Sequence, residues 1–157
     1  MYNLRVRKRA FLFLALTVAL AGFILFTSTN SGASHSELGG RTIEWLNQVI
    51  FQGTLSDGEK EAIVGVSVKL FGHFSLFLLD GLFFTLFLRE LKSKSLQKAL
   101  ILFAFGLVLS ILGEVLQLFS NGRNGNVFDV VIDYSGFLLP YAFAYLWANK
   151  TPLLRRD

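Results

Sequence analysis

The sequence predicts an all-α membrane protein with four transmembrane helices and one short amphipathic helix on the outer surface. Hydrophobic residues make up 53% of the 157 residues and charged residues 17%, against about 25% charged residues in typical globular domains. The mean hydropathy is +0.54. The apolar residues gather in four runs, at residues 10–27, 70–88, 99–119 and 128–147. The whole chain, residues 1–157, is therefore expected to form a single membrane domain.

The length of each run supports this assignment, because a helix needs about 20 residues to cross about 30 Å of hydrocarbon. A helix also satisfies its own backbone polar groups, which lipid cannot do. The first run follows the basic segment 5–9, as in a signal peptide. It is longer than the usual signal core of about 7–15 residues, and no A-x-A cleavage site follows. We therefore favour an uncleaved first helix.

The composition also excludes several classes of protein. The apolar content excludes a disordered chain. The absence of cysteine excludes disulfides, thiolate metal sites and cysteine nucleophiles. Two histidines are too few for a three-histidine zinc site.

The basic residues predict the orientation in the membrane. Lys and Arg are in excess on the cytoplasmic side of membrane proteins, and 11 of the 15 basic residues lie in three segments on one predicted side. Both termini should thus be cytoplasmic, with residues 28–68 and 119–127 outside. This distribution beside membrane spans argues against a nucleic-acid partner. The 11 residues are Arg5, Arg7, Lys8, Arg9, Arg89, Lys92, Lys94, Lys98, Lys150, Arg155 and Arg156.

The predicted outer segment contains two helix signals. Residues 42–52 carry one apolar stripe, which predicts a short helix on the outer membrane surface or, alternatively, one packed against protein loops. Ser56 and Glu59 have the spacing of a capping box. A helix that starts there and runs through residue 88 would be ~48 Å long, so its first third must lie outside or bend near Gly65.

Seven polar residues lie at one depth near the predicted outer boundary. A charged residue inside a span costs about 2.5–3.5 kcal/mol on insertion scales, so each requires a reason. Three predicted helices and one loop bring these residues to about one helical turn, or ~5 Å, below the boundary. They are Lys69, His73, Glu114, Gln117, Arg123, Asp129 and Asp133.

We interpret these residues as one polar cluster that binds a ligand. A purely structural role stays open, because a His73–Glu114 pair or an Arg123–Asp129 pair would also lock helices together. Asp80 is separate, near the predicted midplane. We expect it to be protonated or hydrogen bonded, for example to Ser110 or Tyr141, because an isolated buried carboxylate is costly.

Three blocks of the sequence resemble the VanZ-like family of small bacterial membrane proteins. The first is the segment Lys-Leu-Phe-Gly-His-Phe at 69–74, which is similar to a basic residue followed by His-Phe. The second is Glu-Val-Leu-Gln-Leu-Phe at 114–119, which is similar to an acid-x-x-Gln-x-Phe pattern. The third is Gly122-Arg123, followed by Asp129 and Gly136. The resemblance implies a multi-pass protein of the bacterial cell membrane, linked to lowered susceptibility to teicoplanin-type glycopeptide antibiotics.

Three functions are compatible with these residues, and the first is favoured. A non-enzymatic envelope protein would bind a lipid-linked envelope precursor or a lipoglycopeptide at the outer leaflet, with Arg123 and Lys69 holding anionic groups. An intramembrane hydrolase or transferase would use His73 as general acid or base, oriented by Glu114. A proton- or cation-coupled transporter would relay charge through His73, Asp80 and Glu114.

No cofactor is required by the favoured function, and membrane lipids are the expected surroundings. A variant of the enzyme hypothesis would hold a divalent cation on nitrogen and oxygen ligands. Such ligands suit Mg or Mn better than structural Zn. The set would be His73, Glu114, Asp129 and Asp133.

Overall fold

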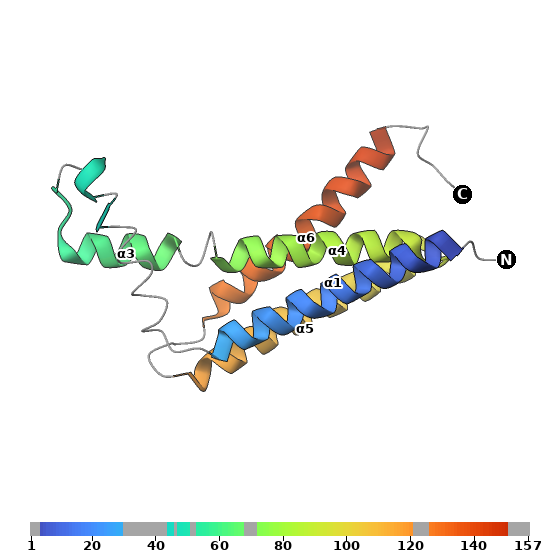
Figure 1. Ribbon diagram of the computed structural model, residues 1–157, viewed down its shortest axis with the longest axis horizontal. Helices are drawn as coiled ribbons and strands as arrows, with labels where there is room; N and C mark the ends of the chain where they lie inside the picture. Colours follow the sequence, from blue (N-terminus) through green and yellow to red (C-terminus); the bar gives the residue numbers. More distant parts are fainter. Residues whose placement is uncertain are drawn as a thin grey trace.

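The computed structural model describes residues 4–29, 44–45, 47–50, 53–67, 72–120 and 126–150. All regular structure in this part of the chain is helical. Figure 1 shows the arrangement of its five long helices. In chain order they are α1 (Leu4–Thr29), α3 (Asp57–Ser67), α4 (Phe74–Glu90), α5 (Ser95–Leu118) and α6 (Val127–Lys150).

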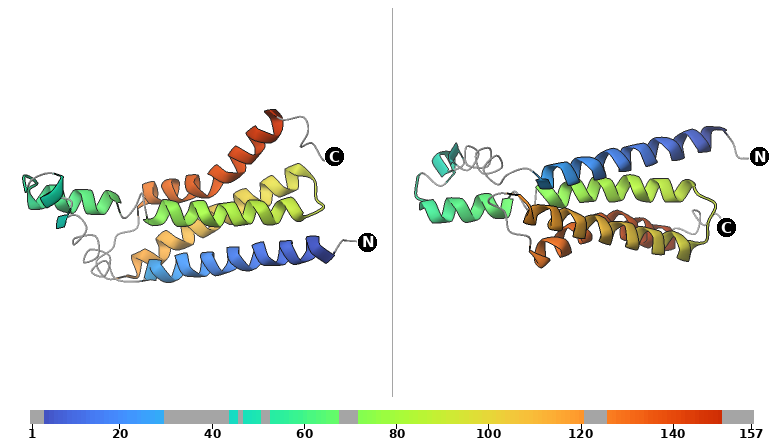
Figure 2. Two further views of the ribbon diagram at one scale, coloured as in Figure 1. Left: turned by 45° about the horizontal axis from the view of Figure 1, so that its top comes forward. Right: turned by 90° about the horizontal axis from the view of Figure 1, so that it is seen from below.

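Helices α1, α4, α5 and α6 lie side by side as a bundle, and α3 projects beyond the end at which α4 begins (Figures 1 and 2). The beginning of α1 and the end of α6 lie at the same end of this bundle. Pro140 lies inside α6, and the C-terminal half of that helix turns away from α4. A proline lacks one backbone N–H donor and clashes with the preceding turn, which explains a bend there.

Three helices are long and apolar enough to cross a membrane, at residues Val6–Thr29, Ser95–Leu118 and Val127–Trp147. In the most apolar 18 residues of each helix, only 11%, 33% and 17% are buried inside the protein. Large exposed apolar side chains cover them, including Phe11, Leu100 and Phe143. Contiguous apolar surface of this extent marks contact with lipid rather than water.

The predicted span at residues 70–88 is observed as α4, which begins at Phe74 and has 17 residues. At 1.5 Å per residue it is about 25 Å long. It is shorter than the three apolar helices, so the predicted count of four spans is not established by helix length. The helix predicted to start near residue 57 is observed as α3, which is described through Ser67, and α4 is described from Phe74. Whether one helix continues to residue 88 depends on residues 68–71, which lie outside the described residues.

The predicted capping box at the start of α3 is confirmed. The Ser56 backbone N–H donates to Glu59 Oε2 at 2.8 Å, and the Glu59 N–H donates to Ser56 Oγ at 3.4 Å. The side-chain and backbone hydrogen bonds from Ser56 lower the pKa of the Glu59 carboxyl. These bonds satisfy two donors at the start of the helix, which explains why α3 begins at Asp57.

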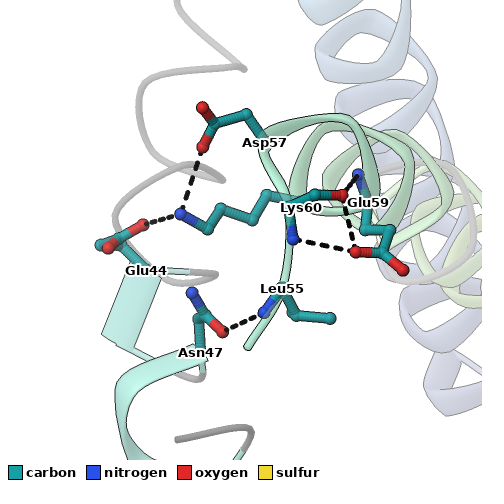
Figure 3. A network of polar contacts seen from close by, with 7 residues as sticks. Glu44, Asn47, Leu55, Asp57, Glu59 and Lys60 are labelled. Atoms are coloured by element: carbon teal, nitrogen blue, oxygen red, sulfur yellow. Dashed lines mark hydrogen bonds and ion pairs between the residues drawn. The ribbon is translucent and has the colours of Figure 1, made fainter. Parts of the chain in front are cut away.

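The start of α3 is tied to the preceding residues, as Figure 3 shows. Lys60 Nζ lies 3.3 Å from both Glu44 Oε2 and Asp57 Oδ1, and these two carboxylates raise the pKa of the Lys60 ammonium group. The Leu55 N–H donates to Asn47 Oδ1 at 3.2 Å. Of the predicted amphipathic helix at 42–52, residues 44–45 and 47–49 are helical. Among its described residues the apolar side chains of Trp45, Val49 and Ile50 are exposed.

The core depends on close packing between α4 and α6. A Cβ atom on Gly81 would overlap the Phe137 carbonyl oxygen, and one on Gly136 would lie 2.8 Å from the Phe74 carbonyl oxygen. The two backbones therefore touch at two places, as small residues permit in membrane helix pairs. The fully buried Phe137 ring enters between α4 and α5, where it lies over Gly106.

Single cysteines test the predicted orientation, because the chain has no native cysteine. Asn124→Cys should react in intact cells with a thiol reagent that cannot cross the membrane. Ser95→Cys should react only after the cells are opened. The reverse pattern of labelling would overturn the orientation derived from the basic residues.

Replacing Gly81 tests the helix packing. Gly81→Ala should lower the free energy of unfolding by about 1–3 kcal/mol, because the added methyl group overlaps the α6 backbone. Gly22→Ala is the matched control. Its Cβ would meet nothing within 4 Å, and alanine favours helix over glycine by up to about 1 kcal/mol. Unfolding in mixed detergent micelles measures the free energy of unfolding of both variants. Equal changes in Gly81→Ala and Gly22→Ala would contradict the close approach of α4 and α6.

Candidate functional site

One end of the bundle collects most of its buried polar side chains. We call this the polar end. It is the end at which α1 and α5 finish and α4 and α6 begin (Figure 1). The Ser120 hydroxyl, just after α5, donates to the Ser28 carbonyl oxygen near the end of α1 at 3.0 Å. This bond holds the ends of two helices together beside the polar cluster.

Glu114 is the acceptor around which the polar end is organised. Gln117, one turn later in α5, donates its Nε2–H to Glu114 Oε1 at 2.9 Å. The Asn126 backbone N–H donates to Glu114 Oε2, also at 2.9 Å. Glu114 and Gln117 are 5% and 4% exposed. Buried polar groups are tolerated when their hydrogen bonds are made, so this carboxylate links the end of α5 to the start of α6.

Asn126 is a contributor that the sequence prediction missed. Its side-chain oxygen accepts from the Phe128 N–H at 3.0 Å, and its carbonyl oxygen accepts from the Asp129 N–H at 2.9 Å. Asn126 thus caps the N-terminus of α6 while its own N–H binds Glu114. An Asn directly before an apolar run is a helix-start signal that could have identified it. Asp129 lies buried in the first turn of α6, where the helix dipole favours a negative charge.

His73 and Asp133 meet across helices at the polar end. The His73 Nδ1 atom, on the turn before α4, lies 3.8 Å from Asp133 Oδ2 on α6. Their side chains are 12% and 3% exposed. The contact is a consequence of the helix crossing, because Phe74 follows His73 and its carbonyl oxygen packs on Gly136, one turn after Asp133. A carboxylate beside an imidazole can orient the ring.

Five of the seven residues predicted for the cluster are therefore buried or partly buried at this end. They come from the residue before α4 and from α5 and α6, and are His73, Glu114, Gln117, Asp129 and Asp133. The other two, Lys69 and Arg123, lie outside the described residues. Three of the five are acids, so the described part of the cluster is rich in carboxylate oxygens.

The acids do not converge as a metal site. Among the residues that the structure describes, no group of three or more His, Asp or Glu side chains could hold a metal ion. His73, Glu114, Asp129 and Asp133 all belong to that part of the chain.

Asp80 lies apart from the cluster, two turns or about 10 Å beyond His73 along α4. It is fully buried, and neither carboxylate oxygen has a hydrogen-bond partner in the described part of the chain. The two bonds suggested by the sequence are not found. Ser110 donates instead to the Gly106 carbonyl oxygen at 2.9 Å, and the Tyr141 ring packs edge-on against Phe103.

The fold and this cluster define a class, that of small helical membrane proteins with a buried polar site at one end of a lipid-exposed bundle. The VanZ/LLP1 family model matches residues 13–148. The chain belongs to this family, as its three sequence blocks suggested. Neither curated proteins nor solved structures gave a match to the chain.

Two substitutions of Glu114 separate hydrogen bonding from charge. Glu114→Met keeps the length of the side chain but accepts no hydrogen bond, which strands the Asn126 N–H and the Gln117 amide. It should lower the free energy of unfolding by about 1–3 kcal/mol. Glu114→Gln should cost less than about 1 kcal/mol. Its oxygen accepts from Asn126, and its amide donates to Gln117 once the Gln117 amide turns over.

Unfolding in mixed micelles measures this difference, and Val115→Met is the control on the exposed face of the same helix turn. Equal losses for Glu114→Met and Glu114→Gln would mean that charge, not hydrogen bonding, holds the end of α5 to α6. If Glu114→Gln instead unfolds at nearly the same free energy as the unchanged protein, it serves as a folded variant from which only the charge is removed.

Proposed function

We propose that this protein binds an exported lipid-linked envelope precursor or a lipoglycopeptide at its polar end, without catalysing a reaction. The observation that supports it most is the burial of His73, Glu114, Asp129 and Asp133 together at one end of a bundle whose sides face lipid. Ionisable residues within membrane helices are costly and mark functional sites. Membership of the VanZ/LLP1 family is consistent with a role in glycopeptide susceptibility.

In this proposal α4 is a fourth transmembrane helix and both termini are cytoplasmic, in a bacterial cell membrane. The polar end then lies at the outer leaflet, because α1 and α5 end there. The excess of basic residues at the opposite end of the bundle supports this orientation. Residues 44–45 and 47–50 then lie on the outer membrane surface, where the exposed Trp45 side chain suits the interface.

The chemistry of the ligand follows from the two signs of charge. Buried carboxylates accept hydrogen bonds from ammonium and hydroxyl groups, as amino sugars provide. Lys69 lies four residues before His73, and Arg123 lies six residues before Asp129 in the sequence. These two basic residues would hold phosphate or carboxylate groups. An amphiphile with both kinds of group beside an acyl chain matches a site at the edge of a lipid-exposed bundle.

The contact between His73 and Asp133 favours one alternative, an intramembrane hydrolase or transferase. An imidazole oriented by a carboxylate 3.8 Å away can act as general base or acid. In that function His73 would move the proton, Asp133 would orient the ring, and Arg123 would stabilise phosphate charge. Turnover of a lipid-linked substrate would separate this function from simple binding.

A binding measurement tests the proposal with purified protein in lipid nanodiscs and fluorescent teicoplanin as the probe. Arg123→Ala should raise the dissociation constant at least about tenfold, because a charge-assisted hydrogen bond contributes about 1.5–3 kcal/mol. Glu114→Gln and Asp129→Asn should weaken binding similarly, since each removes a charge at nearly constant shape. A glycopeptide without an acyl chain should bind more weakly than teicoplanin.

Controls distinguish the outcomes. Phe143→Leu, on the lipid-exposed far half of α6, should bind the probe as the unchanged protein does. Competition by a lipid-linked precursor would assign the native ligand to that class. Release of a phosphate or sugar product, abolished by His73→Ala, would replace the binding function by the enzyme. Unchanged affinity in Arg123→Ala and Glu114→Gln would place the ligand elsewhere.

A further inference from the structure

A groove of about 380 Å³ opens between α1 and α4 at the end of the bundle opposite the polar end. We call this the basic end. The groove is open on one side, and its volume lies within the roughly 300–1,000 Å³ of small-molecule sites. It is lined by Arg7, Phe11 and Leu14 of α1 and by Phe87, Glu90 and Leu91 at the end of α4.

The lining residues form two continuous helix faces. Arg7, Phe11 and Leu14 follow the i, i+4, i+7 spacing of one face of α1. Phe87 lies in the last turn of α4, and Leu91 directly follows the end of that helix. Arg7 lies toward the beginning of α1, and Phe11 and Leu14 follow it along the helix axis toward the middle of the bundle. This order, from charged to apolar along the helix axis, matches the order of headgroup and acyl chain in a phospholipid.

The charge around the groove is strongly positive. Glu90 is the only acid in residues 4–14 and 84–100, and it already has an interaction partner. Basic residues near a membrane surface attract anionic lipid, by about fivefold in affinity for each one. Those at this end include Arg7, Lys8, Arg9, Arg89, Lys92 and Lys94.

We propose that this groove binds one phospholipid with an anionic headgroup, with the phosphate on Arg7 and an acyl chain along Phe11, Leu14 and Phe87. Phe11 is 74% exposed, so the ring of this residue is available to the acyl chain. The lipid fills the space that α1 and α4 leave between them, and it ties the beginning of α1 to the end of α4. This site lies at the other end of the bundle from the polar end, so it does not depend on the function proposed there.

Tryptophan quenching by brominated lipid tests the proposal in the full-length protein. In a background with Trp45→Phe and Trp147→Phe, Phe11→Trp reports on the groove. One set of vesicles contains brominated phosphatidylglycerol mixed with ordinary phosphatidylcholine. The other set contains brominated phosphatidylcholine mixed with ordinary phosphatidylglycerol. The anionic lipid should associate at Phe11→Trp about fivefold more strongly than the zwitterionic one. The ratio of anionic to zwitterionic lipid association is thus the quantity compared. Phe103→Trp, on the exposed side of α5 near Lys98, is the matched control and should show a ratio near one.

Arg7 carries the selectivity in this proposal. Arg7→Gln should bring the ratio at Phe11→Trp to about one, and Arg7→Lys should keep most of it. Arg89→Gln removes a charge at the same end from outside the groove and should lower the ratio less than Arg7→Gln does. Ala10 of α1 also lines the groove, and Ala10→Phe, which fills it, should reduce quenching by both lipids. The Phe103→Trp reporter, added to each variant, checks that the protein stays folded.

Three results would overturn the proposal. The same ratio at Phe11→Trp and Phe103→Trp would mean that the basic surface attracts anionic lipid without a groove. An equal fall of this ratio in Arg89→Gln and Arg7→Gln would also mean that the basic surface, and not the groove, selects the anionic lipid. If neither brominated lipid quenched the tryptophan of Phe11→Trp, a second copy of the chain would cover the groove.

Discussion

The close approach of α4 and α6 is the constraint on which the rest of the structure depends. Gly81 and Gly136 let each backbone touch the other, at Phe137 and at Phe74. Because His73 precedes Phe74, and Asp133 lies one turn before Gly136, the crossing also determines the distance between these two polar residues. Dispersion contacts over a helix interface provide packing energy that the hydrophobic effect cannot supply between helices in lipid.

The polar end shows how buried charge is made compatible with this packing. Glu114 accepts hydrogen bonds at both oxygens, and one of its donors is a backbone N–H at the start of α6. A helix start has unpaired N–H groups that must find acceptors, so the carboxylate satisfies a need of the fold as well as its own. Asp80 differs, since neither of its oxygens has a hydrogen-bond partner in the described helices. Nothing in the packing of α4 explains why an acid stands there.

The two ends of the bundle carry opposite chemistry. Carboxylates are buried among helices at the polar end, whereas arginine and lysine side chains are exposed at the basic end. Apolar side chains cover the surface between them. A bilayer has the same sequence of environments along its normal, with interfaces on either side of hydrocarbon. This asymmetry underlies the two proposals, which assign an exported amphiphile to the polar end and an anionic lipid to the basic end.

The sequence by itself determined the helical membrane fold, the family and the capping box at Ser56, because hydropathy and cap spacing are local properties of the chain. It also brought Glu114 and Gln117 together, as one helix turn separates them. It could not determine the partner of His73, which is Asp133, sixty residues later. It also could not reveal that Asn126 binds Glu114, or that the groove at Arg7 exists. These features depend on how far apart the helices stand, and contacts of glycine and phenylalanine across the bundle decide that spacing.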